Sequence, residues 1–83
     1  MEEGFTLPIL YKGQERDFAA TLITTGYTHK FHVDIDGVGI YFEPDEERNY
    51  RAILDEEAIA KQLKPNVDLV RLIGLKIEEL FKK

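Results

Sequence analysis

The sequence predicts an α+β fold, a single two-layer domain over residues 1–83. We expect an antiparallel β-meander of four to five strands with one face covered by two C-terminal helices, in the order ββββ(β)αα. Three observations predict this. Apolar and polar residues alternate along residues 5–43, as in strands with one buried face. Glycine-containing pairs interrupt the alternation where tight turns are expected. Near the C-terminus, apolar residues recur at helical spacing.

The pair Asp36-Gly37 predicts the central hairpin. Asp-Gly readily adopts the positive φ angles of a two-residue type I′ turn, and alternating runs lie on both sides of it. We therefore expect strands over residues 28–35 and 38–43. This turn pairs the strands so that six apolar side chains share one face, namely Phe31, Val33, Ile35, Val38, Ile40 and Phe42.

Two further turns extend the meander toward the N-terminus. The first strand is expected at about residues 5–11, before a turn around Gly13, and the second at about residues 16–25. Gly26-Tyr27 fits a type II′ turn, whose first central residue should be glycine. These turns place apolar side chains of both strands on the apolar face of the central hairpin, namely Leu7, Ile9, Phe18, Ala20 and Leu22.

The C-terminal part of the chain predicts an edge strand and two helices. A short apolar run at residues 50–54 is expected to form a fifth strand. Asp55 is suited to cap a helix over residues 55–64, which Pro65 should stop. A last helix is expected over residues 66–81 because its apolar residues form one stripe, made of Leu69, Val70, Ile73, Ile77, Leu80 and Phe81.

Composition narrows the classes of function. The chain has no cysteine, which excludes disulfides and thiolate metal sites, and no serine, a common catalytic nucleophile. The net charge is −5, with acids concentrated in residues 34–57, and this disfavours binding to nucleic acid. There is no secretory signal pattern and no apolar run of membrane-spanning length. We therefore expect a small soluble cytoplasmic protein without membrane association.

The two histidines and the neighbouring carboxylates are the first candidates for chemistry. His29 and His32 lie three residues apart on one strand, so they should point to opposite faces and cannot share a metal ion. We expect His29 to pack at the edge of the core face. His32, Asp34 and Asp36 alternate along the other face, but a flat row of side chains rarely converges on one ion. We predict no metal, no cofactor and no catalytic group.

Two surfaces are candidates for binding a ligand or partner. On the sheet face turned away from the helices, Lys30 and Glu43 should form a cross-strand charge pair, and Asp34 should lie nearby. Beside them the expected pairings place a transverse row of side chains, namely Thr21, His32, Tyr41 and Arg51.

The second surface lies on the last helix. Leu72 and Leu75 fall outside the main apolar stripe, three residues apart. Core packing favours the interpretation that they receive Ile59 and Leu63 of the preceding helix. In the alternative interpretation they form a contact for a second chain.

Three classes of function follow from these surfaces. The lack of catalytic chemistry and the exposed apolar residues favour a non-catalytic module that binds a protein, either another chain or a second copy as a homodimer. The alternative is single-stranded nucleic-acid binding on the exposed sheet face. Strands followed by a helix resemble the topology of Whirly and Pur-type domains, which implies that Tyr41 and His32 stack bases while Lys30 and Arg51 meet phosphates. The third hypothesis is a small metal-binding or enzymatic domain using His32, Asp34 and Tyr41.

Overall fold

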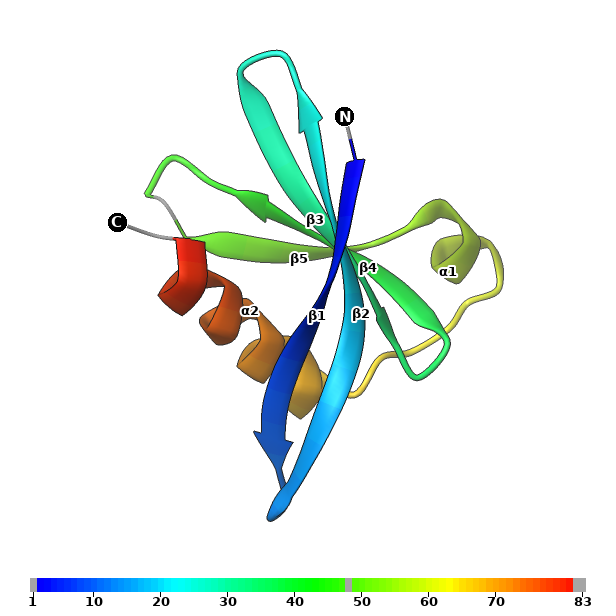
Figure 1. Ribbon diagram of the computed structural model, residues 1–83. Helices are drawn as coiled ribbons and strands as arrows, with labels where there is room; N and C mark the ends of the chain where they lie inside the picture. The colour runs from blue at the N-terminus through cyan, green and yellow to red at the C-terminus, as the bar shows by residue number, and fades with distance from the viewer. Residues whose placement is uncertain (1, 48, 82–83) are drawn as a thin grey trace.

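The computed structural model describes residues 2–47 and 49–81 and confirms the α+β fold. Five antiparallel strands follow one another in chain order across an open sheet, so that the first and last strands form its edges. Two helices come after the last strand (Figure 1). The elements are β1 (Glu2–Tyr11), β2 (Gln14–Thr25), β3 (Thr28–Ile35), β4 (Val38–Pro44), β5 (Tyr50–Leu54), α1 (Glu56–Ala60) and α2 (Val67–Phe81).

The turns on either side of β3 have the backbone conformations that their sequences predict. Asp36 and Gly37 have φ angles of 52° and 87°, as a type I′ turn requires. Gly26 has a φ of 59° whereas Tyr27 is not in the positive-φ region, which fits type II′. The predicted registers of β2 with β3 and of β3 with β4 are therefore confirmed over every residue pair in these two ladders.

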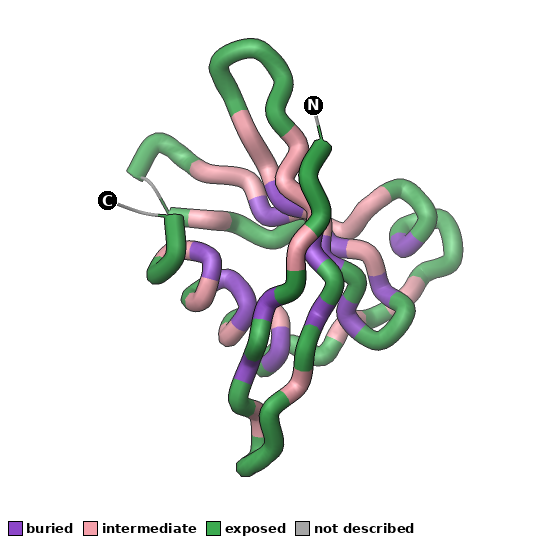
Figure 2. The backbone as a smooth tube through the Cα atoms, in the orientation of Figure 1, coloured by how far each residue is buried: buried purple, intermediate pink, exposed green. Residues whose placement is uncertain are grey.

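The inner face of the sheet carries the core, and α2 lies along it (Figures 1 and 2). α2 contacts both β1 and β5, the two edges of the sheet, so the sheet curves around the helix. The buried apolar side chains are Leu7, Ile9, Phe18, Ala20, Phe31, Val33, Ile35, Val38, Ile40, Phe42, Ala58, Leu69, Ile73 and Ile77. This set confirms the apolar face predicted from the turns, except that Leu22 is only partly buried against the core.

An aromatic cluster closes one end of the core. The fully buried ring of Phe31 is at its centre, with the Phe81 ring centroid 4.8 Å away and that of Phe5 5.9 Å away. Tyr50 and His29 complete the cluster at 5.6 Å and 5.7 Å from Phe31. Rings from β1, β3, β5 and the last turn of α2 therefore meet in one place.

The register of β5 differs from the predicted one by two residues. Ile53, not Arg51, lies opposite Tyr41. The preceding loop sets this register: the Asp45 N–H donates to the Asn49 carbonyl oxygen at 2.8 Å and closes the loop tightly. Because the shift is two residues, each β5 side chain keeps its face and only its neighbours change.

The first helix is shorter than expected. The helix predicted over residues 55–64 ends at Ala60. Gln62 then adopts a left-handed conformation with a φ of 55°, and the Leu63 N–H donates to the Ala58 carbonyl oxygen at 2.9 Å. This is the hydrogen-bond pattern of a Schellman turn, which usually has glycine at the left-handed position. The sequence therefore lacks the glycine that usually marks such a helix end.

α1 packs beside β4, apart from α2 (Figure 1). The Asp55 N–H donates to the Gly39 carbonyl oxygen at 2.9 Å, which keeps the chain against β4 up to the start of the helix. As a result Ile59 remains 60% exposed and Leu75 remains 55% exposed. The expectation that the first helix buries Leu75 is wrong, although Leu72 packs partly against the core.

Candidate binding face of the sheet

The outer face of the sheet, opposite α2, carries a row of side chains that crosses four strands. Thr21, His32 and Tyr41 occupy adjacent strands in the predicted order. Ile53 takes the position that was expected for Arg51. Arg51 lies opposite Glu43 instead, one step along the same face. The centre of the face is therefore more apolar, and less basic, than the sequence predicted.

Tyr41 is the centre of this row and is held by contacts on the face itself. The Nζ atom of Lys30 lies over the Tyr41 ring, 4.2 Å from its centroid, rather than in the expected pair with Glu43. The His32 ring is 5.0 Å away at an angle of 64°, an edge-on contact. A cation over an aromatic ring contributes roughly 0.5–1 kcal/mol at exposed sites. The Tyr41 ring thus contacts both the Lys30 ammonium and the His32 imidazole.

His32 is held in turn by Asp55. The Nε2 atom of His32 lies 2.8 Å from Oδ2 of Asp55, and the Asp55 side chain is only 17% exposed. The other carboxylate oxygen, Oδ1, accepts the Ala58 N–H at 2.8 Å and so caps α1. The hydrogen bond from His32, followed by that from the Ala58 N–H, holds the pKa of the Asp55 carboxyl below its usual value.

Gly39 makes the contact between His32 and Asp55 possible. It lies on β4 between these two side chains, and a Cβ added to it would stand 1.8 Å from Oδ2 of Asp55 and 2.8 Å from Nε2 of His32. The Asp55 carboxylate therefore occupies the space that the side chain of any larger residue at position 39 would fill. Sequence reasoning treated Asp55 only as a helix cap. The available signal was a glycine at an outward position within a strand, which often marks such a close approach.

The carboxylates near His32 serve separate structural roles. Oδ1 of Asp34 accepts the Gly37 N–H at 2.8 Å and so stabilises the β3–β4 turn. Asp36 forms an ion pair with Arg16 of β2. His32, Asp34 and Asp36 therefore have different partners and do not converge. Within residues 2–47 and 49–81, no group of three or more His, Asp or Glu side chains is placed to hold a metal ion.

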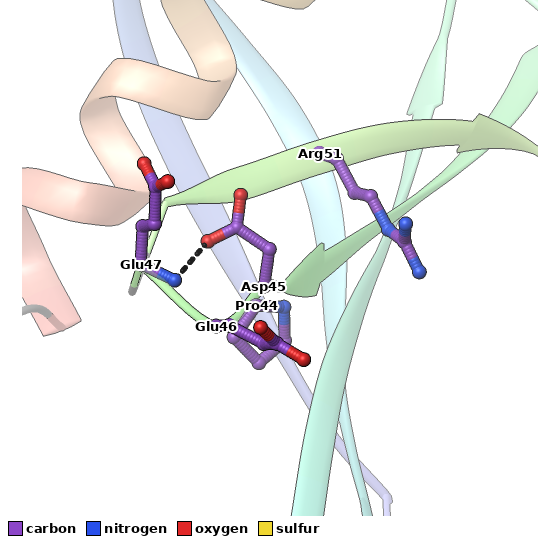
Figure 3. A pocket seen from close by; sticks show the side chains of 5 residues that line it. All are labelled: Pro44, Asp45, Glu46, Glu47 and Arg51. Atoms are coloured by element: carbon purple, nitrogen blue, oxygen red, sulfur yellow. Dashed lines mark hydrogen bonds between the residues drawn. The ribbon is translucent and has the colours of Figure 1, made fainter.

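An acidic loop beside the face forms an open hollow, but its side chains do not converge (Figure 3). Oδ1 of Asp45 accepts the N–H groups of Glu47 and Asn49, each at 2.9 Å, so this carboxylate holds the loop together. The side chains of Glu46 and Glu47 point in different directions, and the guanidinium of Arg51 points away from the loop. The described side chains of the loop therefore lack the geometry of a cation site.

His29 lies on the opposite side of β3 from His32, as the strand alternation predicted. Its Nε2 atom is 2.8 Å from the Tyr50 hydroxyl, at the edge of the aromatic cluster. Burial, and to a lesser degree the negative charge of Glu78, raises the pKa of the Tyr50 hydroxyl. His29 is thus a packing residue at the edge of the core.

A second exposed surface lies along α2. Leu75 borders a shallow groove between α2 and β1. Leu10 of β1, on the other side of the groove, is 70% exposed. The groove is lined by Pro8, Ile9, Leu10, Leu72, Leu75, Lys76 and Glu79.

Comparisons of the chain with protein-family models, with curated proteins and with solved structures found no match. Neither helix in the described part of the chain is long and apolar enough to cross a membrane. The fold and the outer face together define a small α+β domain with an open sheet and one partly aromatic sheet face that α2 does not cover.

Proposed function

We propose that this domain is a non-catalytic module that binds another protein through the outer face of its sheet. The observation that supports this proposal best is the chain of contacts from Lys30 through Tyr41 and His32 to Asp55. These contacts fix an aromatic side chain at the centre of a face that α2 does not cover. A fixed side chain loses little conformational entropy when a partner binds, so more of the contact energy remains as affinity.

The composition of the face also suits a protein partner. Tyrosine is enriched at protein interfaces, where its ring supplies contact area and its hydroxyl supplies a hydrogen bond. Ile53, within the central row, and Ile23, beside it, add apolar area. Glu43 and Arg51 lie toward one end of the face and form a polar border. An apolar centre with a charged rim is the usual arrangement of a protein interface.

The same contacts weigh against the nucleic-acid alternative. A base would have to stack on Tyr41 in competition with Lys30, which already lies over the ring. His32 is engaged by Asp55, whose carboxylate brings a negative charge to the face. Asp34 and Glu43 on the same face add further negative charge. Single-strand binders instead combine open aromatic platforms with a positively charged groove.

The proposal is tested by affinity capture with immobilised protein and extract of the source cells, followed by quantitative mass spectrometry. Tyr41→Ala removes the centre of the face. Tyr27→Ala is the matched control, because Tyr27 is fully exposed at the tip of the β2–β3 hairpin. We expect proteins that are retained by the wild type and by Tyr27→Ala but lost with Tyr41→Ala.

Binding of a captured protein should then be mapped on the ¹H–¹⁵N spectrum of the purified domain. Shift changes centred on His32, Tyr41 and Ile53 are expected. The proposal is overturned if no protein depends on Tyr41, or if the changes lie elsewhere. A titration with mixed single-stranded oligonucleotides at low salt provides the competing outcome, since shifts on Lys30, His32 and Tyr41 there would favour nucleic acid instead.

A further inference from the structure

The exposed side of α2 carries a regular stripe that the core does not use. Arg71, Leu75 and Glu79 follow one another at intervals of four residues, which places them on one side of the helix. All three residues are exposed, and Leu75 is 55% exposed. Leu75 is not among the residues of the core, so more than half of its side chain is open to a partner.

The groove beside Leu75 has both apolar and charged side chains, since Lys76 and Glu79 line it together with leucine, isoleucine and proline residues. The groove lies between α2 and β1, and Leu10 stands 70% exposed on the far side. Two exposed leucines beside a groove give a partner both a ridge and a depression to pack against. Covering these exposed apolar side chains removes them from water, which favours association.

The charges on the stripe are arranged so that it complements itself. Arg71 lies one turn before Leu75 and Glu79 one turn after it. Neither residue forms an ion pair with another residue in the described part of the chain. If two copies of α2 pack antiparallel about a two-fold axis at Leu75, Arg71 of each copy faces Glu79 of the other, and the pair occurs twice.

We propose that the stripe Arg71–Leu75–Glu79, with Leu10 beside it, is an isologous interface to a second copy of this chain. A different partner would need an acidic group opposite Arg71 and a basic group opposite Glu79. A second copy provides both by symmetry. The α2 stripe lies on the other side of the sheet from the proposed binding face, and Leu10, next to the β1–β2 turn, is not among the residues of that face. Either proposal can therefore fail without affecting the other.

The free edge of β1 does not offer a simpler way to pair two copies. Tyr11 and Gln14 flank the two-residue β1–β2 turn, so they form a hydrogen-bonded pair. Alternation along the ladder then places Pro8, opposite Asp17, at a non-bonded pair, with its missing N–H on the free edge. A strand added there would lack a hydrogen bond at that position, which disfavours pairing of two copies through this edge. A contact made by so few side chains predicts a weak dimer.

Analytical ultracentrifugation over a concentration series up to about 1 mM tests the self-association, since even a weak interface associates in that range. We expect a reversible monomer–dimer equilibrium. Leu75→Glu should weaken it by about tenfold or more. Ile59→Glu is the matched control, because Ile59 is a 60% exposed apolar residue on α1, and it should leave the equilibrium unchanged.

A charge exchange tests the two-fold arrangement. Arg71→Glu alone and Glu79→Arg alone each place like charges opposite one another, so each variant should dimerise about tenfold more weakly or worse. An equimolar mixture of the two variants restores both opposite-charge pairs and should form a heterodimer. A wild type that stays monomeric throughout, a dimer that Leu75→Glu does not weaken, or a mixture that stays as weak as its components would each overturn the proposal.

Discussion

The carboxylate of Asp55 reaches across β4 and meets the imidazole of His32, with 2.8 Å between Oδ2 and Nε2. The contact joins the end of the fifth strand to the third strand, although the fourth lies between them. Asp55 also caps α1, so one side chain fixes both the helix and the central row of the outer face. Four predictions about this contact and the surrounding fold can be tested with single variants.

Gly39→Ala should destabilise the protein by roughly 1–3 kcal/mol, because the new methyl group would displace the Asp55 carboxylate from His32. Urea denaturation measures the loss. Gly4→Ala is the matched control: the nearest atom to its added Cβ would be the Ala20 carbonyl oxygen, 3.9 Å away, so the change should be small. Equal stabilities of wild type and Gly39→Ala would contradict the steric argument.

The titration of Asp55 should show the effect of its hydrogen bonds. Its lowered pKa means that it contributes stability above its unfolded pKa, about 3.9, and that this contribution is lost as the pH falls through the lower folded value. We expect the carboxyl ¹³C shift of Asp55 to titrate with a midpoint below the usual one.

Substitution of each histidine in turn tests the cause of the lowered Asp55 pKa. His32→Ala should move the Asp55 midpoint back toward its ordinary value, because the largest cause of the lowered pKa is the hydrogen bond from His32. His29→Ala, on the opposite face of β3, should leave the midpoint in place. A midpoint that is unaffected by His32→Ala would contradict the assignment.

Gln62→Gly should stabilise the protein by roughly 0.5–1 kcal/mol. Gln62 is held at a φ of 55°, where a side chain is strained and glycine is not. Thermal or urea unfolding measures the change. Gln14→Gly supplies the control, since Gln14 lies in β2 outside the positive-φ region and glycine there should be destabilising. A loss of stability in Gln62→Gly would show that the side chain makes a compensating contact.

Phe81→Ala should destabilise the protein by roughly 1–2 kcal/mol, because it removes the ring that packs against Phe31 and Phe5 at the end of the core. Phe81 is 42% exposed, so the loss should be smaller than for a fully buried ring. The neighbouring Leu80 is 51% exposed, and Leu80→Ala should cost less than about 1 kcal/mol. Similar losses for both variants would argue against a specific role of the aromatic cluster.

On the outer face of the sheet, the sequence predicts which face each side chain occupies better than it predicts that side chain's neighbours. The predicted surface residues of β2 to β4 share the outer face because strand alternation and turn geometry assign faces without knowledge of the rest of the chain. Arg51 keeps its face but not its neighbours, since the loop before β5 closes through Asp45 and changes the register by two residues. The neighbours of a side chain depend on register, and here register depends on a loop without a sequence signature.

The sequence by itself determined the order of the elements, the apolar face of the sheet and the turns at Gly26 and Asp36-Gly37. These features depend on φ preferences and alternation, which act within a few residues. Only the tertiary structure decided where α1 ends, how β5 pairs and that Asp55 meets His32, 23 positions away. The last contact depends on the space left by Gly39 once the strands are paired, and local preferences carry no information about such space.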